Sequence, residues 1–422
     1  MTWLLHRIRL WFGLRGLVPR PEVLRSRLGF NDAPPSDQLP IKLLVFSHNL
    51  GQEGASISLK ELVSGLKHRG AVVPEIVAFE DGPLRAEYES FGIPVNVLPG
   101  ILHKISTLGR LNLEVEQLAL LIQASGAEVV FVNTLLNFPA ILAAEKAGVP
   151  SVWNQRESEP WNSYFRFLPD PVAQHAIAAI GLPKQVIFVA EATRAVWKDF
   201  EDWGNFKVIR NSLNQRRFAK YLSGDRDAER KGLGWLKDEI VFLCVGTVCE
   251  RKGQVDALLA LDGIADKLDV PIRLVFAGDA SGSYARQQKR LALRFGEHSK
   301  VRVDFVAATA DIGRYYLAAD VFLLCSRVES YPRVILEAMA FGLPIISTPV
   351  FGVAEQLPDP EDAKFYEPRD VAGLGEIMVE MVNDPIARKR LGERSHVRLL
   401  QMDSFDQMVG GYESVLRQCS LR

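Results

Sequence analysis

The run of residues 321–348 constrains the fold more than any other part of the chain. The apolar residues Val321–Cys325 predict a fully buried strand of a parallel sheet. Proline is tolerated only near the first turn of a helix, so Pro332 predicts that a helix begins there, and Gly342 with Pro344 predicts its end. Residues 345–348 then predict the next strand. Open parallel α/β sheets bind ligands at the carboxyl ends of their strands, and this unit should build such a sheet.

Two carboxylates lie where this unit would bind a ligand. Glu329 follows the first strand, and Glu337 lies early in the helix, where side chains tilt toward the helix N-terminus. Backbone N–H groups near Ser330 and Tyr331 can hold phosphate oxygens, and carboxylates accept hydrogen bonds from sugar hydroxyls. Together these groups predict a sugar-nucleotide site. For either acid alone, a solvated helix residue or a loop charge would be the preferred interpretation.

The whole run, Glu329-Ser-Tyr-Pro followed by Glu337-Ala-Met-Ala-Phe-Gly-Leu-Pro-Ile-Ile, resembles the E-x7-E signature of a known enzyme family. These are the retaining glycosyltransferases of the group 1, or family 4, type, which have two Rossmann-like domains (GT-B architecture). The resemblance implies that Glu337 binds the nucleotide ribose, that Glu329 binds the transferred sugar, and that amides at Ser330 and Tyr331 bind donor groups. It extends over roughly residues 41–420 and is strongest over 239–357.

Length and composition agree with an α/β protein of two Rossmann-like domains that face each other across a cleft. A chain of 422 residues exceeds one typical core. We expect a basic N-terminal segment and linker (1–40), an acceptor domain (41–211) and a nucleotide-sugar domain (212–422) whose last helices return to the first domain. The formal charge of −1 disfavours a broad nucleic-acid surface.

The pattern of apolar runs predicts the strands of both domains. They are expected at 41–47, 72–79, 95–98, 129–132, 151–153 and 185–190 in the first domain, and at 239–246, 272–278, 301–306, 321–325 and 345–348 in the second.

Residues 1–28 differ in composition from the rest of the chain. Trp3, Trp11 and Phe12 are mixed with Arg7 and Arg9, and the apolar stretches are too short and too charged to span a membrane. Such a segment can lie on an anionic membrane surface or pack on the enzyme itself, and the sequence leaves both open. We expect a cytoplasmic protein, with peripheral contact to the inner face of the membrane as one alternative.

Two loops of the first domain hold candidate ligand contacts. Residues 48–56 contain Gly54, which the resemblance places toward the donor phosphates, although a simple β–α turn is the alternative and the pattern is not G-x-G-x-x-G. After the strand at 151–153, many relatives carry a histidine where this chain has Asn154 or Gln155. Arg156 and Glu157 either face the acceptor or pair with each other.

The loop Thr247–Gly253 is the candidate phosphate site of the second domain. Lys252 is placed to meet donor phosphate oxygens at the carboxyl end of a strand. In the family an arginine commonly follows the first glycine of this loop, but here Thr247 occupies that position. Arg251 is a candidate for the second positive charge. For this loop alone, a surface Arg–Lys pair is the alternative.

The resemblance implies a retaining glycosyltransferase, with a hexosyltransferase favoured. It would move a sugar from a UDP- or GDP-type donor to a glycan or lipid-linked acceptor during polysaccharide or glycolipid assembly. Lys252 would stabilise the departing diphosphate, and Glu329 would act without forming a covalent intermediate. The only D-x-D triplet, Asp225–Asp227, lies in a polar stretch, so we expect neither a metal nor a cofactor. The alternative is a catalytically silent, membrane-associated partner of a glycan-assembly complex.

Overall fold

The computed structural model describes residues 40–100, 105–296 and 300–420. The chain forms two compact units: unit 1 comprises the residues up to Arg210 together with Asp406–Arg422, and unit 2 comprises Asn211–Phe405. Each unit is described by itself below. The predictions for residues 1–28 and for most of the linker lie outside the described residues.

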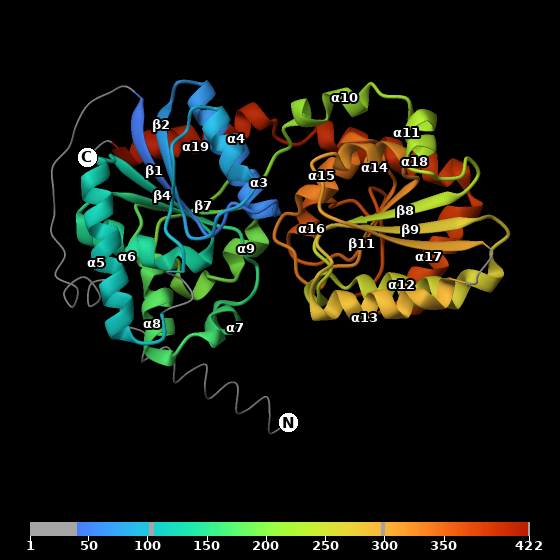
Figure 1. Ribbon diagram of the computed structural model, residues 1–422, viewed down its shortest axis with the longest axis horizontal. Helices are drawn as coiled ribbons and strands as arrows, with labels where there is room; N and C mark the ends of the chain where they lie inside the picture. Colours follow the sequence, from blue (N-terminus) through green and yellow to red (C-terminus); the bar gives the residue numbers. More distant parts are fainter. Residues whose placement is uncertain (1–39, 101–104, 297–299, 421–422) are drawn as a thin grey trace. The chain divides into compact units, whose positions relative to one another are not determined.

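Unit 1 is built on a seven-stranded sheet in which every neighbouring pair is parallel, in the order β3-β2-β1-β4-β5-β6-β7 (Figure 1). Its strands are β1 (Ile41–Ser47), β2 (Val72–Ala78), β3 (Val95–Val97), β4 (Val129–Asn133), β5 (Ser151–Gln155), β6 (Gln185–Phe188) and β7 (Phe206–Val208). Its α-helices are α3 (Gly54–His68), α4 (Leu84–Ser90), α5 (Leu108–Ser125), α6 (Phe138–Ala147), α7 (Trp161–Tyr164), α8 (Asp170–Ala178), α9 (Glu191–Ala195) and α19 (Phe405–Ser420).

Unit 2 contains a six-stranded parallel sheet in the order β10-β9-β8-β11-β12-β13. Its strands are β8 (Ile240–Val245), β9 (Ile272–Ala277), β10 (Val301–Val306), β11 (Val321–Leu324), β12 (Ile345–Ser347) and β13 (Lys364–Phe365). Its α-helices are α10 (Ala219–Leu222), α11 (Arg226–Gly232), α12 (Gln254–Ile264), α13 (Ser283–Ala292), α14 (Ile312–Ala318), α15 (Arg333–Ala340), α16 (Gly352–Gln356), α17 (Val371–Asn383) and α18 (Pro385–Leu400).

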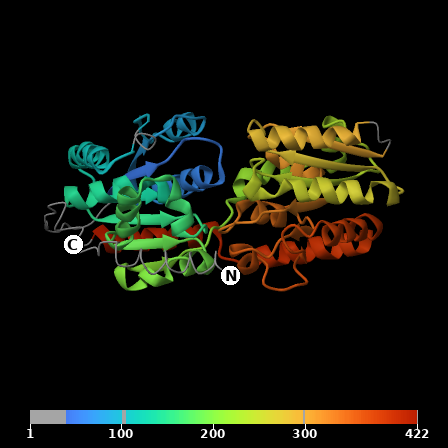
Figure 2. The ribbon, with the colours of Figure 1, turned by 90° about the horizontal axis from the view of Figure 1, so that it is seen from below.

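The expected α/β fold with two Rossmann-like domains is confirmed, and helices cover both faces of each sheet (Figures 1 and 2). Each predicted strand has a counterpart within two residues at either end. Only β7 and β13 were not predicted. Both are edge strands of three and two residues that are only partly buried, so neither shows the continuous apolar run of a buried strand.

The last helix, α19, packs in unit 1. Successive strand residues point to opposite faces of a sheet, so Phe131 of β4 faces away from Val130 and Val132, which belong to the main apolar core of the unit. Phe131 forms an edge-on ring contact with Tyr412 of α19, with ring centroids 6.1 Å apart. α19 therefore covers the face opposite that core, although it follows unit 2 in the sequence.

Both sheets change direction of winding next to their first strand. In unit 1 the chain moves outward from β1 to β3 and then returns to place β4 on the other side of β1. In unit 2 it does the same with β8 and β11. Such a switch point leaves the carboxyl ends of two central strands open to a ligand. No helix in the described parts of the chain is long and apolar enough to cross a membrane.

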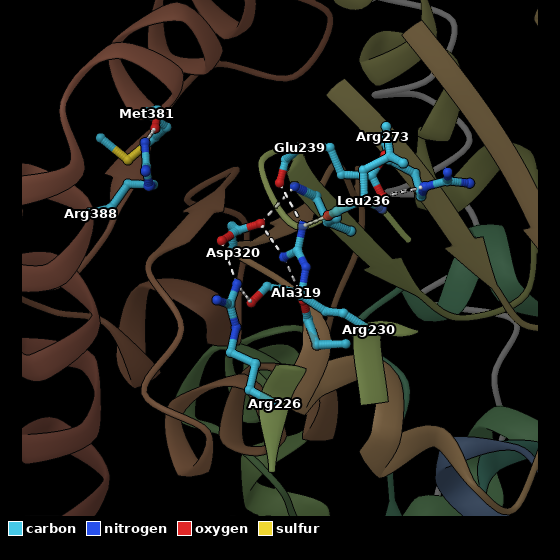
Figure 3. A network of polar contacts seen from close by, with 11 residues as sticks. Arg226, Arg230, Leu236, Glu239, Arg273, Ala319, Asp320, Met381 and Arg388 are labelled. Carbon is cyan, nitrogen blue, oxygen red and sulfur yellow. Dashed lines mark hydrogen bonds and ion pairs between the residues drawn. The ribbon is translucent and has the colours of Figure 1, made fainter. Parts of the chain in front are cut away.

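At the opposite end of the unit 2 sheet, a buried arginine joins the starts of two strands (Figure 3). Arg230 of α11 is only 3% exposed and donates to the Asp320 carboxylate at 2.9 Å and to the carbonyl of Glu239 at 2.6 Å. Asp320 precedes β11 and also accepts the N–H of Val241 in β8 at 2.9 Å. Because every partner is a fixed acceptor, the guanidinium anchors α11 to the sheet.

We predict that Arg230→Met lowers the free energy of unfolding by about 3 kcal/mol, because it leaves buried acceptors without their donor. The matched control is Arg226→Met. Arg226 contacts the same Asp320 carboxylate, but its side chain is 43% exposed, so the loss should stay under about 1 kcal/mol. Urea-induced unfolding of the two variants checks this difference, and equal losses would contradict the role given to Arg230.

Candidate active site

An ion pair joins two loops at the switch point of unit 2. Lys252 ends the short 3₁₀ helix η7 (Glu250–Lys252) after β8, and Glu329 lies in the loop between β11 and α15. The Lys252 ammonium contacts the Glu329 carboxylate, and Ser326 Oγ donates to the same carboxylate at 2.6 Å. The Glu329 side chain is only 7% exposed. The structure thus brings together two residues that the sequence predicted separately.

Opposing effects set the charge of Glu329. Burial alone would raise the pKa of its carboxyl group, but the cations Lys252 and Arg251 and the hydrogen bonds from Lys252 and Ser326 outweigh it. The net pKa of Glu329 lies below its usual value, so the group is ionised at neutral pH. An ionised carboxylate can accept hydrogen bonds from hydroxyls but cannot donate a proton.

Arg251 and Thr247 differ in what they offer to this site. Arg251 Nη1 lies 4.0 Å from Glu329 Oε2 and donates to the carbonyl of Val328 at 3.0 Å. Its side chain is 49% exposed. The guanidinium therefore lies beside the carboxylate that Lys252 holds. Thr247 is exposed after β8, where it contributes no charge, and its carbonyl accepts Gln254 Nε2 at 2.9 Å.

Gly253 allows the two loops to approach closely. It has a left-handed backbone with φ of +63°, which disfavours any residue with a Cβ. A Cβ built there would also overlap Arg327 Nη1 and the carbonyl oxygen of Cys325. Arg327 itself is fixed, since its Nη2 donates to Asp256 of α12 at 3.0 Å and its backbone N–H donates to the Arg251 carbonyl at 2.8 Å. Lys252 is thus held on a turn with no space for a side chain beside it.

Glu337 lies on α15, which begins after Pro332 as predicted. Glu337 is 5% exposed and its Oε2 accepts the hydroxyl of Tyr316 at 2.9 Å. Its Oε1 lies 3.5 Å from Arg217 Nη1 and 3.8 Å from Arg333 Nη2. The carboxylate therefore has a donor or a cation at each oxygen.

Ser330 and Tyr331 lie immediately before α15. Ser330 is half-buried, and the side chain of Tyr331 is buried. The Tyr331 carbonyl accepts Asn211 Nδ2 at 3.0 Å. This bond fixes the backbone at the start of the helix, where the macrodipole favours an anion.

In unit 1, three candidate residues lie at the carboxyl end of β5. Asn154 is fully buried, and its amide contacts the Asn133 side chain at 2.9 Å and the Tyr412 hydroxyl at 3.0 Å. Arg156 Nε donates to Asn133 Oδ1 at 2.9 Å. Asn154 therefore joins β4, β5 and α19, whereas the half-buried Arg156 lies nearer the surface.

Glu157 is held by backbone groups. Its carboxylate accepts the N–H of Leu135 at 3.1 Å and of Arg156 at 3.0 Å. Burial raises the pKa of Glu157, although these two hydrogen bonds and the nearby His48 and Arg156 act in the opposite direction. Glu157 is thus easier to protonate than an ordinary glutamate.

Gly54, the remaining candidate, is the first residue of α3. A Cβ added there would meet no atom within 4 Å, and its backbone is not left-handed. The preceding loop is closed instead by Asn49, whose Oδ1 accepts the N–H of Gly51 at 3.1 Å and the hydroxyl of Ser56 at 2.7 Å. The fold of this loop does not require a glycine at position 54.

Sequence reasoning missed several residues around the two acids of unit 2. Arg333 could have been found, because it lies four residues before Glu337 on the same helix face. Tyr316 and Arg217 lie 21 and 120 residues away from Glu337, and no local pattern connects them with it. Within the described ranges, no group of three or more His, Cys, Asp or Glu side chains could hold a metal ion.

Comparison with known proteins places part of this chain beside glycosyltransferases. Residues 225–398 match the family model described as glycosyl transferases group 1. A mannosyltransferase of Corynebacterium glutamicum, named as GDP-mannose-dependent and acting on a monoacylated phosphatidylinositol monomannoside, is 28% identical over 54% of this chain and 61% of its own length. The N-acetyl-alpha-D-glucosaminyl L-malate synthase of Bacillus anthracis is 24% identical over 50% and 53%. The chain thus matches little more than half the length of these curated relatives.

Among solved structures, Anabaena HepE in complex with UDP and glucose superposes with a TM-score of 0.75. The match covers 89% of this chain and 99% of HepE at 20% sequence identity, and at this identity the likeness concerns the fold. The fold and the matched segment define a protein of the two-domain GT-B class. The matched segment, which makes up most of unit 2, is thus similar to the group 1 glycosyltransferases.

We predict that Gly253→Ala destabilises the protein by about 2 kcal/mol, because the new methyl group enters a left-handed turn that is already filled. The matched control is Gly282→Ala, where a Cβ would meet nothing within 4 Å and φ is negative. Its effect should stay within about 0.5 kcal/mol. Thermal unfolding of both variants tests this, and a neutral Gly253→Ala would show that the turn adapts.

Proposed function

We propose that this protein is a retaining glycosyltransferase that moves a hexosyl group from a nucleoside-diphosphate sugar to an acceptor hydroxyl. The observation that carries the proposal is the pairing of Lys252 with Glu329 at the carboxyl ends of β8 and β11, next to the helix that presents Glu337. Cations, a helix N-terminus and two buried acids supply the complementary groups for diphosphate, sugar and ribose.

In this proposal the positively charged side chains of unit 2 bind the diphosphate of the donor. Lys252 leaves Glu329 in part to meet the phosphate oxygens, and Arg251 supplies a second cation where Thr247 has none. Backbone groups at Ser330 and Tyr331 bind further donor oxygens. As the bond to the sugar breaks, negative charge grows on the departing diphosphate, and fixed cations stabilise that charge without reorganisation.

Glu329 binds hydroxyls of the transferred sugar, and Glu337 binds the ribose. Glu329 is ionised and already contacts Lys252 and Ser326, so it is suited to accept sugar hydroxyls. We assign it no covalent bond to the sugar. The acceptor hydroxyl instead attacks the anomeric carbon on the face that the diphosphate leaves, and its proton passes to the departing phosphate oxygen.

Unit 1 binds the acceptor in this proposal. Arg156 and Glu157 lie at the carboxyl end of β5, where they offer a cation and a carboxyl group whose pKa burial raises. Asn154 braces Arg156 through Asn133. We propose a glycan or lipid-linked acceptor on the cytoplasmic side of a membrane, with residues 1–28 making the peripheral contact. The named relative that acts on a phosphatidylinositol mannoside supports an acceptor of this kind.

The nucleotide of the sugar donor is either UDP or GDP. HepE was solved with UDP, whereas the named Corynebacterium glutamicum relative depends on GDP-mannose. Both therefore enter the first test.

We predict micromolar binding of UDP or GDP to the wild-type protein and weakening by about tenfold or more in Glu337→Gln, because a charged acceptor for two ribose hydroxyls is lost. Isothermal calorimetry measures both, with ADP alongside. The control is Glu376→Gln, an exposed acid on α17. If no nucleotide binds to folded protein, the donor site is refuted and a catalytically silent partner becomes the better description.

We further predict that Lys252→Ala lowers the transfer rate by about a hundredfold, because one preorganised cation for the leaving group is removed. Lys237→Ala, an exposed lysine before β8, should leave the rate unchanged. Transfer can be followed as nucleotide release in the presence of an acceptor. NMR of the product should show the anomeric configuration of the donor, and an inverted product would contradict the retaining mechanism.

A further inference from the structure

We infer that Tyr316 is a positioning residue that orients the Glu337 carboxylate so that both of its oxygens can serve the vicinal hydroxyls of the donor ribose. The inference rests on the proposed function, because it takes Glu337 as the ribose ligand. It adds a residue to which neither the family signature nor the spacing of the two acids assigns a role.

The first observation is that Tyr316 combines complete burial with a single polar contact to the site. Its side chain lies on α14 and is 0% exposed, and its hydroxyl donates to Glu337 Oε2 at 2.9 Å. A buried phenol needs a hydrogen-bond partner, and here that partner is the candidate ligand itself. The hydrogen bond joins α14 to α15, so it can fix the rotation of the Glu337 carboxylate about its terminal side-chain bond.

The second observation is that the ring of Tyr316 is fixed by other aromatic rings. It stacks on Phe341 with centroids 5.5 Å apart and an interplanar angle of 12°. Phe322 lies 5.9 Å away, and Phe218 meets the ring edge-on at 6.3 Å. A hydroxyl on an immobilised ring provides a fixed donor, and that is what a preorganised site requires of its supporting residues.

The third observation concerns the other oxygen. Glu337 Oε1 lies 3.5 Å from Arg217 Nη1 and 3.8 Å from Arg333 Nη2. The neutral phenol of Tyr316 and the two cations therefore contact different oxygens of the carboxylate. A carboxylate has about four acceptor directions, and a single hydrogen bond at Oε2 leaves room there for a hydroxyl. With the carboxylate plane fixed, the diol binds without the entropy cost of orienting Glu337.

The proton of this hydrogen bond stays on the phenol. Burial raises the pKa of Tyr316 well above its usual range, and the charge of Glu337 acts in the same direction. Tyr316 therefore keeps its proton and remains a hydrogen-bond donor at neutral pH.

The test is the variant Tyr316→Phe, which removes only the hydroxyl. We would measure the dissociation constants of UDP and GDP, and of their 2′-deoxy and 3′-deoxy forms, by calorimetry. Wild-type protein should prefer the ribose forms by about tenfold. In Tyr316→Phe the ribose nucleotide should bind about fivefold more weakly while the deoxy forms change less than about twofold, so that most of the preference disappears.

The chain supplies a matched control in the neighbouring tyrosine. Tyr315 lies on the same helix but packs against Trp235, with ring centroids 6.0 Å apart. Tyr315→Phe should keep the wild-type preference for ribose. In a Glu337→Gln background, Tyr316→Phe should have no further effect on that preference, because its action passes through the carboxylate.

Each outcome separates this inference from the proposed function. If wild-type protein binds no nucleotide, the proposed function fails. If it prefers ribose and Tyr316→Phe keeps that preference, or weakens all nucleotides equally, the positioning role is overturned while the donor site stands. Should Tyr316→Phe not fold, Phe341→Leu loosens the stacked ring, and it should lower the ribose preference in the same direction by a smaller factor.

Discussion

The buried contact between Lys252 and Glu329 is the interaction on which the site depends. Removing two charges from water is costly, and the cost is recovered only when geometry and further hydrogen bonds are favourable. Here Ser326 adds a bond to the same carboxylate, and backbone contacts tie the loop after β8 to the loop after β11. Gly253 permits the approach because it carries no side chain. The charges are thereby held at the carboxyl ends of two neighbouring strands, where a charged ligand can replace one partner of the pair.

The two acids of unit 2 share one strand–helix segment but have different surroundings. Glu329 faces cations, which keep it ionised in spite of its burial. Glu337 receives a neutral phenol on one oxygen, and two guanidinium groups lie beside the other. One environment suits a group that exchanges partners with an anionic ligand, and the other suits a group that holds a fixed orientation. Only seven residues lie between these acids in the sequence, yet helices and loops from elsewhere in the unit decide how their surroundings differ.

The buried arginine network and the candidate donor site lie at opposite ends of the unit 2 sheet. At the amino ends of β8 and β11, Arg230 donates to backbone carbonyls and to Asp320 in a largely buried network. At the carboxyl ends, half-exposed Arg251 and the Lys252–Glu329 pair lie in loops. Parallel strands make this division natural, because their carboxyl ends carry the loops that open the switch point. In unit 1, Arg156 and Glu157 occupy the corresponding end of β5.

The sequence by itself determined the α/β class, nearly all of the strands and the strand–loop–helix run from Val321 to Thr348. Long apolar runs, Pro332 and Gly342 act locally, so their effect can be predicted from neighbouring residues. Only the tertiary structure decided which side chains meet these elements. It placed Tyr316 and Arg217 against Glu337, Arg251 beside Glu329, and α19 on the unit 1 sheet. It also showed that Gly54 starts a helix with open space around it, whereas Gly253 fills a tight turn. Such contacts join residues far apart in the chain, and no local pattern encodes them because they arise only when the sheet brings its loops together.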